Sequence, residues 1–218
     1  MKAIVSRIQV FFCFLFVLMF VVQSCREDDE VLSLDYNNIA VISYTQHVQP
    51  IFSRSCATSG CHDNATASAG LSLTNWQRLF KGSTYGNVAV PFRIDKSLLT
   101  NLFDGTALRK PHPPLPAHIS LITQAEINFL KRWITEGAKN DDGSIPFEHS
   151  TKKVYVPNQQ EDNVAIIDMD SMVVTRFISV GNSSAVEGPH FIVADNNFWY
   201  VSLISAGQVW KFDAHADT

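Results

Sequence analysis

Hydrophobic and polar positions divide the chain into three zones: an apolar N-terminal run, a segment of helix-like stripes, and a segment of strand-like runs. The first zone begins with the cationic residues Lys2 and Arg7 and continues as an apolar run from Ile8 to Val22. This run is too short, and too soon followed by polar residues, to span a membrane as a helix. A short positive head followed by such a run is typical of a secretory signal.

In the second zone, residues 36–142, apolar residues recur at helical spacing over short stretches that glycine and proline separate. One helix is predicted from Gln46 to Cys56, because Val48, Ile51 and Phe52 recur at helical spacing and Pro50 falls in the first turn, where it is tolerated. That helix would end at Cys56.

Further short helices are predicted around Trp76, with Thr74 or Asn75 as the cap, and after the capping box Thr123–Glu126, with a stop at Gly137. Another is predicted between Asp95 and Gly105, where the apolar stripe consists of Leu98, Leu99, Leu102 and Phe103. These stripes are expected to form mainly the core.

The third zone changes to β-branched runs. Strands are predicted at 153–156, 163–168 and 173–178, after a turn-rich stretch, and we take residues 143–152 as a linker. Residues 153–218 then form the predicted β region.

An internal repeat runs through this β region. Tyr155 recurs as Tyr200 and Asp168 as Asp213, each at an offset of 45 residues. A period of this length in a strand-rich segment is typical of β-propellers. Two blades cannot close a ring, since propellers use four to eight blades. We therefore expect an incomplete propeller, either a piece of a longer one or one whose blades pair with another chain.

The most informative chemistry lies where the first predicted helix ends. Cys56 and Cys61 are followed at once by His62, which is the pattern of c-type haem attachment. In that pattern the thiols bind the porphyrin and the histidine is the proximal iron ligand. Four residues separate the cysteines where the usual number is two, and Gly60 supplies the backbone freedom that a longer gap needs.

Two other interpretations of the same cysteines stay open. Cys56 and Cys61 could form a disulfide in an oxidising compartment. They could also be half of a zinc site, although no second cysteine pair or closely spaced histidine pair is present to complete it. A disulfide has no use for the adjoining His62, so the haem interpretation is favoured.

The end of the apolar run, Val22-Gln23-Ser24-Cys25, resembles a bacterial lipobox, which implies cleavage after residue 24 and lipidation of Cys25. Residues 25–35 then form an acidic tether that resembles the export signal of Bacteroidetes surface lipoproteins. The implied location is extracytoplasmic, on the outer membrane or the cell surface, with the membrane as a partner through the lipid. The alternatives are ordinary signal cleavage that leaves Cys25 as a thiol, and a plain solvated linker.

Several segments together resemble the cytochrome c-like domains of secreted planctomycete and Bacteroidetes proteins, over roughly residues 44–142. They are His47–Phe52, the Cys-x4-Cys-His motif, Ala69–Leu73, Pro113–Pro116 and Ile127–Ala138. The β region resembles Tyr-Val-x-Asn propeller repeats. The resemblance implies a mixed fold, α then β: a small all-α cytochrome c-like haem domain over 36–142, followed by two propeller-blade-like repeats.

That family usually places an axial methionine just before the double proline, and here the position is His112. The four methionines of the chain all lie outside residues 36–142. We therefore predict His112 as the sixth iron ligand, with His47 and His118 as rivals. The alternative for His112 is a surface histidine in a loop.

These features predict an exported electron-transfer lipoprotein that carries one covalently bound haem c and passes electrons to a redox partner protein. One alternative is a binding or scaffold lipoprotein with a Cys56–Cys61 disulfide; another is a fragment of a haem oxidoreductase. No acid/base pair is tied to the haem motif by spacing, so an electron carrier is favoured over an enzyme. A net charge of −4 argues against nucleic acid as a partner.

Overall fold

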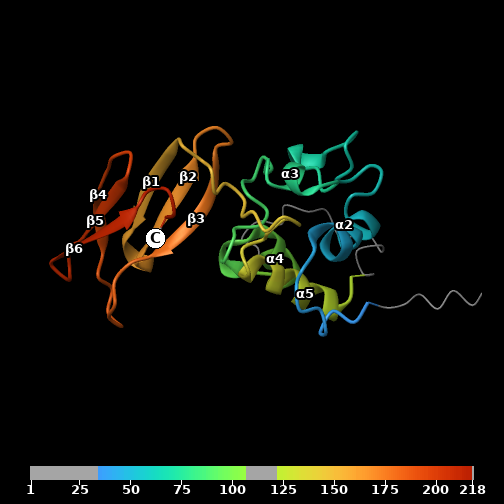
Figure 1. The fold of residues 1–218 in the computed structure, drawn as a ribbon, viewed down its shortest axis with the longest axis horizontal. Helices are drawn as coiled ribbons and strands as arrows, with labels where there is room; N and C mark the ends of the chain where they lie inside the picture. Colours follow the sequence, from blue (N-terminus) through green and yellow to red (C-terminus); the bar gives the residue numbers. More distant parts are fainter. Residues whose placement is uncertain (1–33, 107–121, 218) are drawn as a thin grey trace, which may run out of the picture. The chain divides into compact units, whose positions relative to one another are not determined.

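The computed structural model describes residues 34–106 and 122–217. Residues from Tyr36 onward form one compact unit, with short helices followed by two three-stranded sheets (Figure 1). In the described residues, a π-helical turn at Tyr44–Val48 precedes four α-helices. These are α2 (Gln49–Ser55), α3 (Trp76–Leu79), α4 (Leu98–Phe103) and α5 (Gln124–Thr135).

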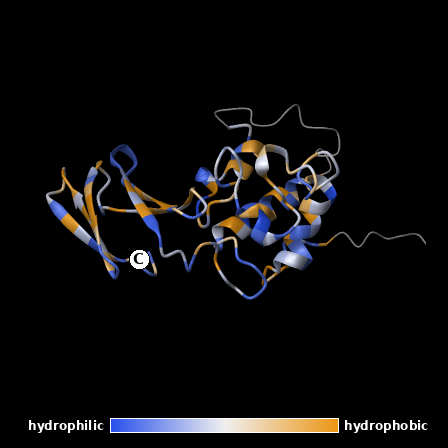
Figure 2. Ribbon diagram, turned by 90° about the horizontal axis from the view of Figure 1, so that it is seen from above, coloured by the Kyte–Doolittle hydropathy of each residue, from blue (hydrophilic) through white to orange (hydrophobic). Residues whose placement is uncertain are grey.

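The first hydrophobic core forms where α2 and α5 bury their apolar faces. Val48, Ile51 and Phe52 are fully buried, as the helical spacing predicted. Phe52 meets the ring of Trp133 from α5 edge to face, with centroids 6.4 Å apart. Figure 2 shows that hydrophobic and hydrophilic positions alternate along the helices.

The predicted helix signals are confirmed at both ends of the helices. The side chain of Asn75 caps α3 by accepting from the amide of Arg78. Thr123 and Glu126 form the reciprocal capping box of α5. The chain leaves α5 through Gly137, whose φ of +104° is a conformation that glycine adopts at little cost.

The prediction of a small all-α cytochrome c-like domain is wrong. The four α-helices have 7, 4, 6 and 12 residues, and turns and 3₁₀ segments connect them. Glycines with positive φ at 82 and 105 follow the ends of α3 and α4. Most of the regular structure in the described residues lies instead in two small antiparallel sheets.

Six strands follow in two antiparallel sheets of consecutive strands. The three predicted strands are present: β2 has the predicted bounds, and β1 and β3 are slightly longer than expected. The first sheet contains β1 (Lys153–Asn158), β2 (Asn163–Asp168) and β3 (Val173–Ser179); the second contains β4 (Pro189–Ala194), β5 (Phe198–Leu203) and β6 (Gln208–Asp213).

A second hydrophobic core joins the two sheets. Trp199 of β5 is fully buried and stacks between two rings. Its centroid lies 4.1 Å from that of Phe212 and 5.1 Å from that of Tyr155 in the first sheet. Val164 of β2 and Val201 of β5 complete the buried centre.

The prediction of propeller blades is also wrong. Each sheet has three strands where a blade has four, and the described sheets do not close into a ring. By the 45-residue repeat, the counterpart of β4 would be a strand before β1, at residues 144–149. It contains Pro146, which has no amide hydrogen, and Phe147 at a φ of +62°, so it turns instead of pairing.

The signal segment, the tether up to residue 33 and Cys25 lie outside the described residues. Within 34–106 and 122–217, no helix is long and apolar enough to cross a membrane.

Candidate functional site

Helix α2 places the first cysteine of the motif. Its buried face anchors it in the first core, and Cys56 caps its C-terminus, donating its amide hydrogen to the oxygen of Phe52 at 2.8 Å. The prediction that this helix ends at Cys56 is confirmed.

The residues between the two cysteines form a closed turn. The amide of Cys61 donates to the oxygen of Thr58 at 3.0 Å, and the amide of His62 donates to the oxygen of Cys56 at 3.1 Å. Gly60 has a φ of +82°, the left-handed region that the longer gap was predicted to need. The backbone of His62 therefore returns to the end of α2 despite the long spacing.

The ring of His62 is held by the backbone that follows the motif. Its Nδ1 lies 3.2 Å from the carbonyl oxygen of Leu71. A carbonyl only accepts, so Nδ1 carries the proton and the lone pair is on Nε2. The amide of Leu73 donates to the oxygen of His62 at 2.9 Å and fixes the same segment from the other side. Histidines that bind metals are typically oriented by such a bond from the second ring nitrogen.

Cys56 and His62 share the wall of one small pocket of about 90 Å³. This volume is below the range of about 300–1,000 Å³ typical of cofactor and ligand pockets. Most of its wall is apolar. Besides these two residues, the lining consists of Ala69, Leu71, Leu73, Ser83, Tyr85, Val88, Leu98, Leu99, Leu102 and Phe103.

The cysteine thiols are both free, and Cys56 is the more informative of the two. Burial raises the pKa of the Cys56 thiol to about 12, and the neighbouring Cys61 adds to this effect. Cys56 is therefore protonated at neutral pH, unlike the thiolates of cysteine nucleophiles. Cys61 is half-buried and is not part of the lining of this pocket.

The predicted rival ligand His47 has other partners. Its Nδ1 accepts the amide hydrogen of Ser43 at 2.9 Å, and its ring meets Phe129 edge-on. It does not line the pocket. His112 and His118 lie outside the described residues, so His112 stays a prediction as sixth ligand.

The zinc interpretation gains no support from the geometry. In the part of the chain that the structure describes, no three histidine, cysteine or acidic side chains gather as a metal site.

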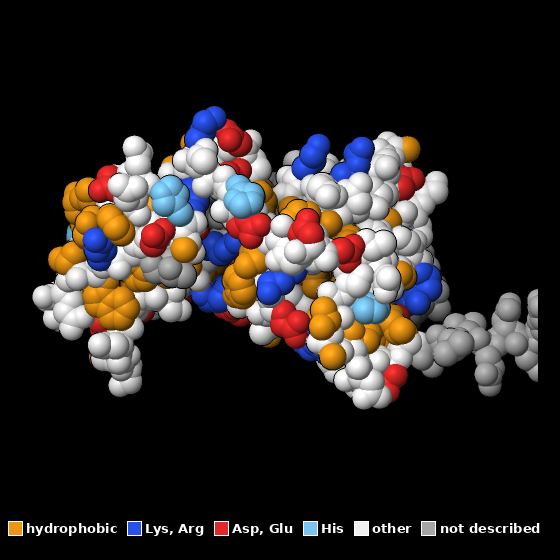
Figure 3. Space-filling view, in the orientation of Figure 1, with side chains coloured by type: hydrophobic (Ala, Val, Ile, Leu, Met, Phe, Trp, Pro, Cys, Tyr) orange, Lys and Arg blue, Asp and Glu red, His pale blue; other side chains and the backbone are white. Residues whose placement is uncertain are grey.

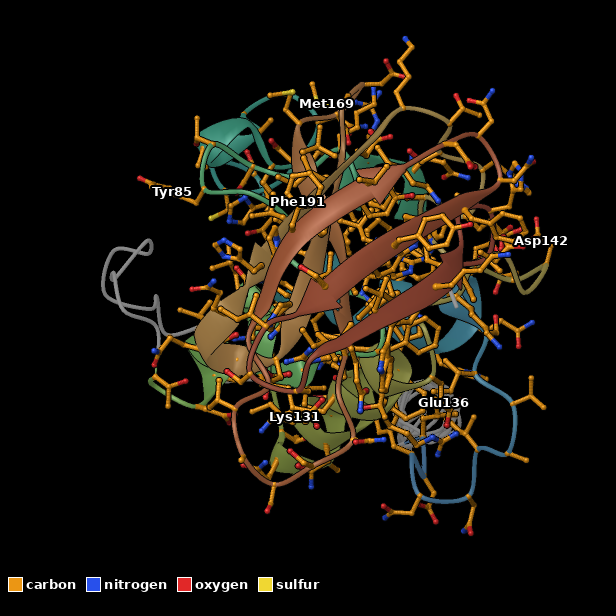
Figure 4. The ribbon with its side chains drawn as sticks, turned by 90° about the vertical axis from the view of Figure 1, so that its left-hand side faces the viewer. Tyr85, Lys131, Glu136, Asp142, Met169 and Phe191 are labelled. Carbon is orange, nitrogen blue, oxygen red and sulfur yellow. The ribbon has the colours of Figure 1, made fainter. Side chains whose placement is uncertain are left out.

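The far wall of the pocket is formed by Leu98, Leu99, Leu102 and Phe103 of α4. The sequence predicted this stripe as core, and in a small haem domain the same core would also enclose the haem. An amphipathic stripe looks the same in both roles. Tyr85 was missed altogether; it lies at the exposed edge of the pocket and its side chain points outward (Figure 4).

Comparison with known proteins adds nothing to this geometry, because no family model, curated protein or solved structure matches the chain.

Proposed function

We propose that this chain binds one haem c covalently through Cys56 and Cys61, with His62 as an axial iron ligand, and that it carries electrons. The observation that supports this most directly is the shared pocket. Its wall contains the Cys56 thiol and a His62 ring whose Nδ1–H is bonded to the Leu71 oxygen. The proposal depends on the motif and this pocket, and it does not require an all-α fold.

The residue types that line the pocket fit such a group, and because the pocket measures only about 90 Å³, a haem would extend beyond it. The apolar side chains of α4 and of Leu71 and Leu73 would exclude water from a porphyrin face. The two cysteines would hold the group by thioether bonds, and His62 would bind iron through Nε2. Bound haem would supply a one-electron iron couple.

We further propose His112 as the sixth ligand, with His118 as the rival. His47 is the weaker candidate because its Nδ1 is bonded to the Ser43 amide and its ring packs on Phe129. Ligation by two histidines gives a lower potential than histidine with methionine. Lipidation of Cys25 would place the carrier on the outside of the cell envelope, where it would meet a redox partner protein.

The test is expression of the full chain together with a haem-maturation system. We expect pyridine haemochrome bands and an intact mass increased by one haem. The double variant Cys56→Ser, Cys61→Ser should lose both signals. His62→Gln should keep the added mass but change the iron spectrum. His149→Gln is the matched control: the His149 side chain is 93% exposed and is not a candidate ligand, so the spectrum should stay unchanged.

A colourless protein whose mass is lower by two hydrogens would contradict the proposal. It would instead support the scaffold lipoprotein with a Cys56–Cys61 disulfide. Binding of carbon monoxide or cyanide to the reduced haem protein would indicate an open iron site, and therefore a haem oxidoreductase in place of an electron carrier.

A further inference from the structure

The 45-residue repeat of the β region is present in its backbone as well as its sequence. Strands β5 and β6 begin and end 45 residues after β1 and β2. The turn that follows each pair is also repeated. Asp168 accepts the amide hydrogen of Ser171 at 2.7 Å, and Asp213 accepts that of Ala216 at 2.9 Å. Equivalent positions of the two sheets can therefore be compared directly.

In the first sheet, one face is covered. Tyr155 pairs with Ile166 across β1 and β2, and Val164 lies two residues before Ile166 on β2. Tyr155 and Val164 therefore lie on the same face of the sheet. Val164 is fully buried and Tyr155 stacks on Trp199 of the second sheet. We call this the covered face.

In the second sheet, the equivalent face is exposed. Val209, the counterpart of Val164, is 70% exposed. On the same face, β4 contributes Phe191 at 65% and Val193 at 55% exposure. We call Phe191, Val193, Tyr200 and Val209 the open face. Figure 4 looks onto this sheet with Phe191 labelled, and Figure 3 shows hydrophobic side chains at the surface over β4–β6.

The repeat also indicates what would cover the open face. The covered face packs against Trp199 and Val201 of β5. Their counterparts in the first sheet are Val154 and Val156, which are 39% and 37% exposed. The molecule thus has two exposed sheet faces that carry apolar side chains, with the charged Lys211 beside Tyr200 on the open face. The repeat relates these faces to the two halves of an interface that the molecule already contains.

We propose that a second copy of this chain docks head to tail, with the open face of one copy on the Val154–Val156 face of the other. The contact would be heterologous, since each copy uses a different surface. Val154 occupies the position that Trp199 has in the internal interface. Because valine is smaller than tryptophan, the interface between copies is smaller than the internal one, and association is reversible.

The experiment is sedimentation of the full chain in a mild detergent over a range of protein concentrations. We expect the mass to rise with concentration beyond the monomer. Val193→Glu and Val154→Glu should each raise the dissociation constant roughly tenfold or more, as for residues central to an interface. Val41→Glu is the matched control: Val41 is 82% exposed, lies outside both sheets, and should leave association unchanged.

Mixing the two variants separates head-to-tail docking from symmetric docking. Val193→Glu keeps the Val154–Val156 face intact, and Val154→Glu keeps the open face intact, so the mixture should form dimers and nothing larger. A wild-type chain that stays monomeric at all concentrations would overturn the proposal. The proposal would also be overturned if Val193→Glu lost association while Val154→Glu kept it, because that result indicates that the open faces of two copies dock on each other. Unchanged circular dichroism verifies that each variant is folded.

Discussion

The amide of His62 donates a hydrogen bond to the carbonyl oxygen of Cys56 at 3.1 Å. This contact brings the backbone of the proposed iron ligand next to that of the first cysteine. A spacing of four residues between the cysteines is therefore compatible with the local geometry that a haem motif requires. The extra residues form the turn around Gly60 and do not lengthen the distance between Cys56 and His62.

The first prediction concerns the thiol of Cys56 in the haem-free protein. Burial raises its pKa to about 12, so almost no thiolate is present at pH 8. We expect iodoacetamide to alkylate Cys56 at least about a hundredfold more slowly in the folded chain than in urea, because only the thiolate reacts. Peptide mass spectrometry at timed intervals measures both rates.

The same shift gives a pH dependence whose direction can be tested. The folded state holds the Cys56 proton more tightly than the unfolded state, so this group contributes full stability below about pH 9. That contribution is lost as the pH rises toward about 12. Cys56→Ser should reduce this alkaline loss of stability. Equal alkylation rates in the folded and unfolded chain would contradict the burial of the thiol.

The second prediction concerns Glu126, the acidic residue of the α5 capping box. Its carboxylate accepts from Arg54 at 2.7 Å and from the amide of Thr123 at 2.8 Å. Burial alone would raise the pKa of Glu126, but these hydrogen bonds outweigh it and lower the pKa. We expect Glu126→Gln to reduce the free energy of unfolding by about 2 kcal/mol at pH 7. Urea denaturation measures it.

The sign of the shift sets the pH range of the effect. The folded state favours the ionised form, so Glu126 contributes stability above its usual pKa of 4.5 and loses it as the pH falls through the lowered value. The difference in the free energy of unfolding between wild type and Glu126→Gln should therefore shrink as the pH falls below 4.5 and through the lowered pKa. Glu136→Gln is the matched control, because its pair with Arg132 is half-exposed and should cost less than about 0.5 kcal/mol.

The local structure could be predicted where short-range chemistry decides it. The spacing of Val48, Ile51 and Phe52 predicted a buried helix face, and all three are buried. Capping at Asn75 and Thr123 is a contact over three residues and needs no knowledge of the fold. For the same reason, the turn at Gly60 was predicted from its neighbours alone.

The global fold could not be predicted in this way. The repeat predicted where β1, β2, β5 and β6 lie, but whether a further strand pairs depends on backbone hydrogen bonds. At Pro146 the amide hydrogen needed for such pairing is missing, and Phe147 adopts a positive φ. The α4 stripe was predicted as core that would also enclose a haem, but its spacing could not show that it forms one pocket with Cys56 and His62.

The third prediction tests the joint between the two sheets. Trp199 is fully buried between Phe212 and Tyr155, and its Nε1 has no hydrogen-bond partner among the described residues. Replacing it with alanine therefore removes packing alone. We expect Trp199→Ala to lower the free energy of unfolding by about 3–5 kcal/mol, because the stacking of Trp199 on Phe212 and Tyr155 is lost.

The matched control is Trp210→Ala. Trp210 lies on the same face of the sheet but is only half-buried, and its Nε1 donates to Gln208 at 2.8 Å. The same substitution there should cost less than half as much, because less apolar surface leaves water on folding. Chemical denaturation of the full chain, with near-ultraviolet circular dichroism as the probe of aromatic packing, distinguishes the two. Equal losses at Trp199 and Trp210 would show that the sheets do not pack through Trp199.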